Sequence, residues 1–260
     1  MPRGESVSRR HILAAVSAVL FLGVPAAWAQ VAGRYNEHEA KPQPNIQDKE
    51  GIWVMDFRFT APRMITVDVP GRGRRVCWYL LYRVINNTTE PHVFIPDLEL
   101  VTIDRPHVSH DQVLPKVQEA IRRIEDPTGR LDIKNSVTIA SQPIPPSKPN
   151  AAPKAVTGVA IWDDVSPEST HYSIFVSGLS NGWSVDDKDI VRRKTLQLNF
   201  RRLGDKYYQD SREIRFVPPE EWVYRASTLK APDAVKEPSA KPKAAAPPAP
   251  PASKRTTPPR

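Results

Sequence analysis

Apolar residues recur at every second position through the middle of this chain, and this period constrains the fold more than any other feature. Trp53, Met55 and Phe57 alternate with polar or charged neighbours, and the same pattern resumes at 65–69. Successive side chains of a β-strand point to opposite faces, so this period gathers the apolar set on one face. The pattern therefore predicts strands that are buried on one side.

Further strands are predicted where β-branched and aromatic residues cluster between turn signals. Pro70–Gly73 and Asn86-Asn87 are such signals. Many short strands separated by turns are typical of a β-sandwich or barrel. The predicted strands are Val76–Ile85, His92–Ile95, 98–102, Ser136–Ala140, Val156–Trp162, His171–Ser177, Lys194–Arg201 and Glu213–Val217.

One segment has a helical period instead. Apolar residues from Gln112 to Glu125 recur at spacings of three and four. Pro115 is tolerated only in the first turn of a helix, so the helix should begin near Val113 or Leu114. Asp126-Pro127 should end it. We therefore expect an all-β domain with one inserted α-helix.

The first 29 residues have the organisation of a signal peptide. Arg3, Arg9 and Arg10 precede an apolar run at 12–24, and Ala27–Ala29 supplies a small-x-small cleavage pattern. The run is shorter than the ~20 residues that span a bilayer. We expect cleavage after Ala29, export to the periplasm or beyond, and no membrane span afterwards. Ser8–Leu13 resembles a twin-arginine motif, and both the general secretion route and the twin-arginine route remain open.

Composition divides the rest of the chain. Residues 30–49 are polar and are predicted to be a linker, and residues 50–229 to be the β domain, with an insertion at 103–154. Residues 230–260 hold nine Pro and eight Ala, and this composition predicts a disordered tail.

The basic charge is concentrated outside the predicted domain. Of the formal net charge of +8, residues 1–29 carry +2 and residues 230–260 carry +5, which leaves +1 for residues 30–229. A nearly neutral domain attracts phosphate weakly, so we do not expect a nucleic acid as partner. The basic tail is expected to contact anionic polymers.

The single cysteine forms no disulfide within the chain. Cys77 lies between Val76 and Trp78 in an apolar run. We expect it to be a small buried hydrophobic residue, with the stability of the domain coming from an ordinary core.

Several motifs resemble those of known exported proteins. Together they are similar to an uncharacterised family of exported bacterial proteins, over residues 50–226, and they imply an immunoglobulin-like β-sandwich without implying any active-site residue. The motifs are Tyr82–Thr88 with Pro91, Trp162–Pro167, Phe175–Asn181, Lys194–Phe200 and Trp222–Arg225.

The residues before the predicted helix include candidate metal ligands. His107, His110 and Asp111 offer two imidazoles and a carboxylate to zinc, with Asp104 three residues before His107. The alternative is an exposed loop in which Ser109 or Asp111 caps the helix. No cofactor is indicated by any other motif.

Two further segments suggest ligands. Asp186, Asp187 and Asp189 form an acidic cluster without the spacing or glycine of a calcium loop, so a solvated turn is the alternative. Trp183 follows Ser180–Gly182 and is the candidate aromatic for stacking on a sugar ring.

No nucleophile motif or phosphate-binding glycine loop is present. Asp97, Glu99 and Asp104 are the carboxylates that acid–base chemistry would use. We expect a non-catalytic envelope or extracellular interaction module whose partner is a protein or an envelope polymer. The alternatives are a hydrolase or metal-dependent enzyme with its site near 103–154, and a carbohydrate-binding module.

Overall fold

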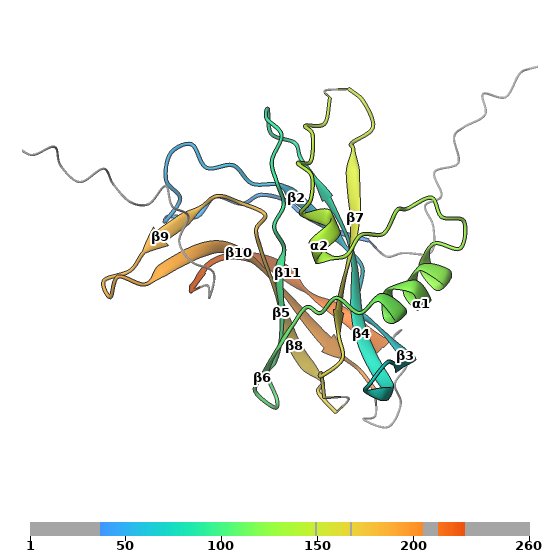
Figure 1. Cartoon of the computed structure of the whole chain (residues 1–260). Coiled ribbons are helices and arrows are strands. Elements are labelled where there is room, and N and C mark those ends of the chain that lie inside the picture. The colour runs from blue at the N-terminus through green and yellow to red at the C-terminus, as the bar shows by residue number, and fades with distance from the viewer. Residues whose placement is uncertain (1–36, 149, 167, 205–212, 227–260) are drawn as a thin grey trace, which may run out of the picture. The chain divides into compact units, whose positions relative to one another are not determined.

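The computed structural model describes residues 37–148, 150–166, 168–204 and 213–226, which form two antiparallel β-sheets (Figure 1). The described residues are 47% strand and 9% helix, which confirms the predicted all-β sandwich. The predicted signal peptide at 1–29 and the predicted tail at 230–260 lie outside the described residues.

The first sheet is built around one long strand. The first half of β4 pairs with β3 and its second half pairs with β2 on the same edge, while β7 pairs with its other edge and β1 pairs with β2. These strands are β1 (His38–Ala40), β2 (Asp56–Phe59), β3 (Arg63–Val69), β4 (Gly73–Ile85) and β7 (Ala155–Trp162).

The second sheet has the strand order β11-β10-β8-β5-β6. The short strand β9 pairs with the start of β10, on the same edge of β10 as β8. The pairings β4–β7 in the first sheet and β5–β8–β10 in the second correspond to strands B–E and C–F–G of an immunoglobulin domain. The strands are β5 (Asp97–Thr102), β6 (His107–His110), β8 (His171–Ser177), β9 (Trp183–Val185), β10 (Val191–Arg202) and β11 (Ile214–Ala226).

The core lies between the sheets and is filled by alternate residues of their strands. Leu196, Leu198 and Phe200 of β10 are buried in it, as the alternation with Gln197 and Asn199 predicts. Removal of such side chains from water is the main stabilising term of a sandwich.

The predicted helix is confirmed as α1 (Pro115–Glu125), with Leu114 as its N-cap and Asp126 as its C-cap. It packs against β3 and β7. Glu125 accepts hydrogen bonds from Tyr79 Oη at 2.6 Å and from Arg63 Nη1 at 2.5 Å. The helix is therefore fastened to both β3 and β4.

A second helix corrects one predicted strand. Residues Ser136–Ile139 form the short helix α2, because the Asn135 side chain accepts from the backbone N–H of Val137 and Thr138 while the Thr138 hydroxyl accepts from the backbone of Asn135. This reciprocal cap outweighs the β propensity of the segment. No helix in the described ranges is long and apolar enough to cross a membrane.

Two other predicted elements differ from the structure. Residues 92–95 form no strand, and His92 makes only an isolated bridge to Ile144. Part of the predicted linker at 30–49 belongs to the sandwich, because β1 pairs with β2 and Asp48 forms an ion pair with Lys194 of β10.

Two consecutive residues join the two sheets at one side. The backbone N–H of Asp111 donates to Leu98 of β5 at 3.0 Å, and that of Gln112 donates to Ile161 of β7 at 2.8 Å. The chain thus passes from β6 of the second sheet across to β7 of the first, and then enters α1.

The outermost strand of the second sheet is irregular. In the pairing of β10 with β11, Gln197 lies opposite Glu221 and Asn199 lies opposite Val217. Residues 218–220, which include Pro218 and Pro219, are therefore bulged out of the ladder. Among the described residues, no strand pairs with the other edge of β11.

Candidate functional site

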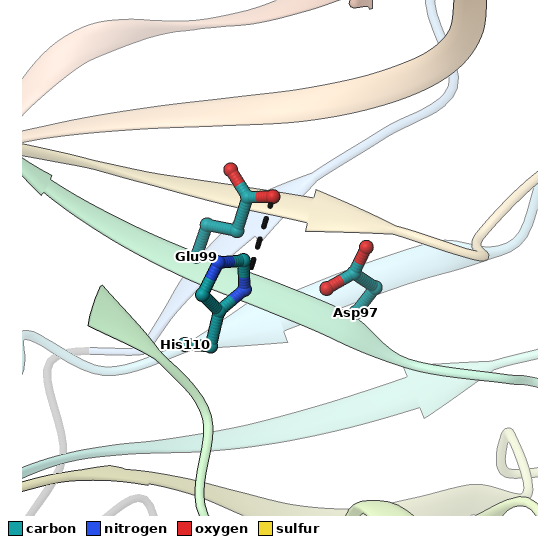
Figure 2. Close-up of side chains that lie close together, drawn as sticks. All are labelled: Asp97, Glu99 and His110. Atoms are coloured by element: carbon teal, nitrogen blue, oxygen red, sulfur yellow. Dashed lines mark ion pairs between the residues drawn. The ribbon is translucent and has the colours of Figure 1, made fainter. Parts of the chain in front are cut away.

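The outer face of the second sheet carries a cluster of ionisable side chains. Leu98 and Leu100 of β5 point into the core, so the alternation turns Asp97 and Glu99 outward. On the neighbouring strand β6, His110 is the direct cross-strand partner of Glu99. Figure 2 shows the three side chains on the same side of the sheet.

The three groups are close together. One ligand atom from each of Asp97, Glu99 and His110 lies within 4.8 Å of the others. Nδ1 of His110 is 4.0 Å from Oε1 of Glu99 (Figure 2). The cluster thus combines one imidazole with two carboxylates.

Arg225 joins this cluster from the far strand of the sheet. Its guanidinium forms an ion pair with Glu99, and its central carbon lies 4.1 Å from the centroid of the Phe175 ring. The side chain therefore extends across the sheet from β11, over the aromatic ring of β8, to β5. Such a cation–π contact keeps the guanidinium close to the ring while it neutralises Glu99.

Asp97 differs from Glu99 in its partners. Within the described ranges no hydrogen bond to its carboxylate is formed, and the residue is half-buried. Burial and the neighbouring charge of Glu99 raise the pKa of Asp97 above its ordinary value, although His110, Arg225 and Arg193 oppose the shift. Among the described residues, this carboxylate is therefore an acceptor without a donor.

Hydrogen-bonded polar side chains continue the same face over β8 and β10. The hydroxyl groups of Ser177 and Thr195 are 3.0 Å apart, and Ser173 Oγ donates to Asn199 at 2.7 Å. The amide of Gln197 also donates to Asn199, at 3.0 Å. The polar side chains of this face thus form two hydrogen-bonded groups, one of Ser177 and Thr195 and one of Ser173, Gln197 and Asn199.

The cluster contains the donor types that bind a transition metal. Two carboxylates and an imidazole match the ligands of zinc and similar ions. Glu99 already compensates Arg225, however, so only Asp97 and His110 offer uncommitted electron pairs. Tight metal binding would require Glu99 to exchange the guanidinium for the ion.

The predicted ligand set of His107, His110 and Asp111 is not brought together. These residues lie in or next to the strand β6 rather than in a loop, and the period of two turns His107 and His110 to opposite sides. His107 Nε2 lies 3.5 Å from Asp164, while His110 lies beside Glu99.

Asp111 is partly buried and lies between β7 and α2. One carboxylate oxygen accepts from the backbone N–H of Ile161 at 2.7 Å, and the other accepts from the hydroxyl of Ser136. Burial raises the pKa of the Asp111 carboxyl to about 7, against the lowering effect of hydrogen bonds from Ile161 and Gln112. The residue secures β7 and α2 and is turned away from His110.

The remaining predicted carboxylates have structural partners. Asp104 accepts from the backbone N–H of Thr170 at 2.7 Å and does not join Asp97 and Glu99. Asp186 accepts from the backbone N–H of Ile190 at 2.9 Å and forms an ion pair with Arg192 at 2.8 Å. The acidic segment therefore closes the turn between β9 and β10.

Trp183 is partly exposed, and Lys49 covers its ring. The ammonium nitrogen of Lys49 lies 3.6 Å from the ring centroid. A sugar stacked on that face of the indole would have to displace the lysine.

Two shallow depressions of the surface lie elsewhere. One is lined by Val69, Arg72 and Leu114 at the start of α1, and the other by Glu119 and Arg123 near its end. Neither is lined by Asp97, Glu99 or His110.

Sequence reasoning identified Asp97, Glu99 and His110 separately and missed Arg225 as their partner. The pairing depends on strand order, because Arg225 and Glu99 are 126 residues apart along the chain. No family model, no curated protein and no solved structure matches this chain.

Proposed function

We propose that this chain is an exported, non-catalytic interaction module that binds a partner protein through the outer face of its second sheet. Export is supported by the basic residues, the apolar run and the Ala27–Ala29 pattern at the start of the sequence. The resemblance to exported bacterial proteins with an immunoglobulin-like sandwich agrees with this proposal.

The half-buried carboxylate of Asp97 carries the proposal. It accepts no hydrogen bond from the described residues, and the charge of Glu99 lies beside it. A partly desolvated carboxylate gains most from a cationic donor that reaches it. The partner therefore presents a lysine or arginine side chain to Asp97.

The surroundings of Asp97 have the composition of a binding surface. Arg225 and Phe175 form a stacked pair beside it, and arginine and aromatic residues are enriched in protein interfaces. Val101 and His110 extend the surface along β5 and β6. The partly exposed side chains of Gln197 and Asn199 on β10 add polar groups at the edge of this surface.

Site-specific photo-crosslinking in cells of the source organism tests the proposal. A photoreactive amino acid at Val101, on this face, should give a discrete crosslinked partner, whereas the same group at Val67 of β3 should not. Asp97→Asn should abolish the crosslink, and the matched change Asp187→Asn, at an exposed acid on the β9–β10 turn, should preserve it. Equal crosslinking from Val101 and Val67, or insensitivity to Asp97→Asn, would refute the proposal.

A metal site is the second candidate function. It is favoured because one ligand atom from each of Asp97, Glu99 and His110 lies within 4.8 Å of the others. Calorimetric titration of the mature protein with zinc separates the two. Saturable binding that is lost in His110→Ala, together with crosslinking that depends on zinc, would assign the face to a metal centre. An absence of heat at micromolar zinc leaves the protein interface as the function of the face.

A further inference from the structure

The inner face of β10 carries a cation at each of its ends. Lys194 and Arg202 are separated by an even number of residues, so both share the face of Leu198 in the core. Lys194 is 1% exposed and Arg202 is 2% exposed. The two buried cations therefore occupy comparable positions at opposite ends of one strand.

Only one of these cations has a counter-charge among the described residues. Nζ of Lys194 lies 2.5 Å from Oδ2 of Asp48 and donates to the backbone oxygen of Gln43 at 2.8 Å. Nε, Nη1 and Nη2 of Arg202 all lack a hydrogen-bond partner in the described ranges. A buried guanidinium without an acceptor costs several kcal/mol.

Further donors without acceptors lie at the same end of the core. Trp78 and Trp162 are direct cross-strand partners, and the rings of Trp78 and Tyr172 are 5.2 Å apart. Tyr172 is the cross-strand partner of Phe200, two residues before Arg202. The indole nitrogens of both tryptophans and the hydroxyl of Tyr172 are buried and have no hydrogen-bond partner in the described ranges.

These groups have a shared requirement. Two indole N–H groups are donors only, a guanidinium is a donor only and positively charged, and a phenol hydroxyl donates readily. Water between them would satisfy the dipoles but would leave the charge of Arg202 uncompensated. An anion satisfies both the donors and the charge.

We propose that this end of the core is a binding site for a small inorganic anion, of which chloride is the representative, held by Arg202 with the hydroxyl of Tyr172 and the indole N–H groups. The loops that lie over the site favour a small anion. The Arg202 backbone N–H donates to Thr170 at 2.7 Å, Asp104 accepts from Thr170, and Arg105 pairs with Glu168 at 2.5 Å. The described residues of the loops at 103–106, 163–166 and 168–170 thus lie over this end of the sandwich and hold it closed.

Thermal unfolding of the mature protein at constant ionic strength, with chloride exchanged for gluconate, tests the site. A ligand that binds only the folded state raises Tm as its concentration rises. The wild type should show this rise, and Arg202→Met should lose it. Lys194→Met is the matched control, because that cation already has Asp48, and it should retain the chloride dependence at a lower Tm.

A milder variant keeps the test valid if Arg202→Met does not fold. Tyr172→Phe removes one hydroxyl and retains the ring, so the chloride concentration at half-effect should increase severalfold. Crystals grown with bromide should show one anomalous peak beside the guanidinium of Arg202. A wild type whose Tm is indifferent to chloride, or an Arg202→Met protein that responds like the wild type, would overturn the proposal.

A carboxylate of the chain itself is the competing counter-charge. Glu213 has a buried oxygen without a partner in the described ranges and precedes Ile214, the cross-strand residue of Arg202. If an anion fills the site, Glu213→Gln should leave the chloride dependence unchanged. If Glu213 supplies the counter-charge, the wild type should be indifferent to chloride and Glu213→Gln should acquire the dependence, which would refute the anion site.

Discussion

Asp48 and Lys194 form an ion pair that attaches the segment before the main domain to the second sheet. The distance between Oδ2 and Nζ is 2.5 Å, and Tyr224 Oη donates to the other carboxylate oxygen at 2.8 Å. Burial would raise the pKa of Asp48, but the hydrogen bonds from Lys194, Asn45 and Tyr224 outweigh it and hold the pKa below its ordinary value. The Asp48 carboxylate therefore remains ionised at neutral pH.

Removal of one partner of this pair should destabilise the fold strongly. We expect Asp48→Asn to lower the free energy of unfolding by about 3–5 kcal/mol, because it leaves the ammonium of Lys194 buried without a counter-charge. The double variant Asp48→Asn/Lys194→Met should lose less than the sum of the single changes. Urea unfolding measures all three, and Glu39→Gln, which breaks a partly exposed pair with Arg58, should cost less than about 1 kcal/mol.

A loss below about 1 kcal/mol in Asp48→Asn would show that the segment contributes little to stability. The stabilisation from Asp48 should also fade on acidification. Its pKa is lower in the folded state than in the unfolded state, so this contribution is present above the unfolded value and is lost as pH falls through the folded value.

Asp111 should give the opposite pH dependence. Its pKa is about 7 in the folded protein and close to the ordinary value of 3.8 in the unfolded chain, so the folded state binds the proton more tightly. Stability from this group is therefore greatest below pH 4 and decreases as pH rises to 7. Asp111→Asn keeps one acceptor oxygen for the Ile161 N–H and offers an NH2 donor to the Ser136 hydroxyl oxygen, without the charge. The variant should gain stability relative to the wild type over this range.

The measurement is the difference in unfolding free energy between Asp111→Asn and the wild type at a series of pH values. The difference should favour the variant increasingly from pH 4 to pH 7, by up to on the order of 3–4 kcal/mol. A difference that stays constant with pH would contradict the raised pKa. Asp187→Asn, at an exposed acid, serves as the control and should show no such trend.

Leu198 should be among the most costly core positions. It is fully buried at the centre of β10, and truncation to alanine leaves a cavity between the sheets. Leu198→Ala should lower the free energy of unfolding by about 2–5 kcal/mol. The matched change Val217→Ala, at an exposed position of β11, should stay within about 0.5 kcal/mol, and similar values for the two would place β10 outside the core.

Cys77 should not react with thiol reagents in the native protein. It is buried on β4, and burial together with the charge of Asp163 raises its pKa to about 11, although Arg75 and Arg72 oppose the shift. The thiolate is the reactive species, so alkylation at pH 8 should proceed only through unfolding. The rate should rise in denaturant to that of a free thiol, whereas rapid labelling without denaturant would indicate local opening of β4.

The period of two in the sequence correctly predicted the β domain, most of its strands and the orientation of Leu196, Leu198 and Phe200. It did so because alternation is a local consequence of strand geometry. The helix at Pro115–Glu125 was predicted for the same reason, since its period of 3.6 and the position of Pro115 are also local. By contrast, Ser136–Ala140 was predicted as a strand because the reciprocal cap of Asn135 and Thr138, which begins the helix α2, was not recognised.

The candidate site could be predicted only in part. Asp97 and Glu99 share a face by alternation, which the sequence contains. Their association with His110 and Arg225 requires the strand order and the register of β5 with β6, which are set by the packing of the whole sandwich. The same limit applies to Asp48 and Lys194, which are 146 residues apart in the chain.

The bulge in β11 has a consequence for how copies of this protein behave at high concentration. Open strand edges invite the strands of other molecules, and this is a common first step of aggregation. Pro218 and Pro219 have no amide hydrogen to offer an incoming strand, and Glu220 and Glu221 add repelling charge beside them. The edge of β11, with which no strand of the described residues pairs, is therefore interrupted at its middle, and this disfavours the joining of neighbouring molecules sheet to sheet.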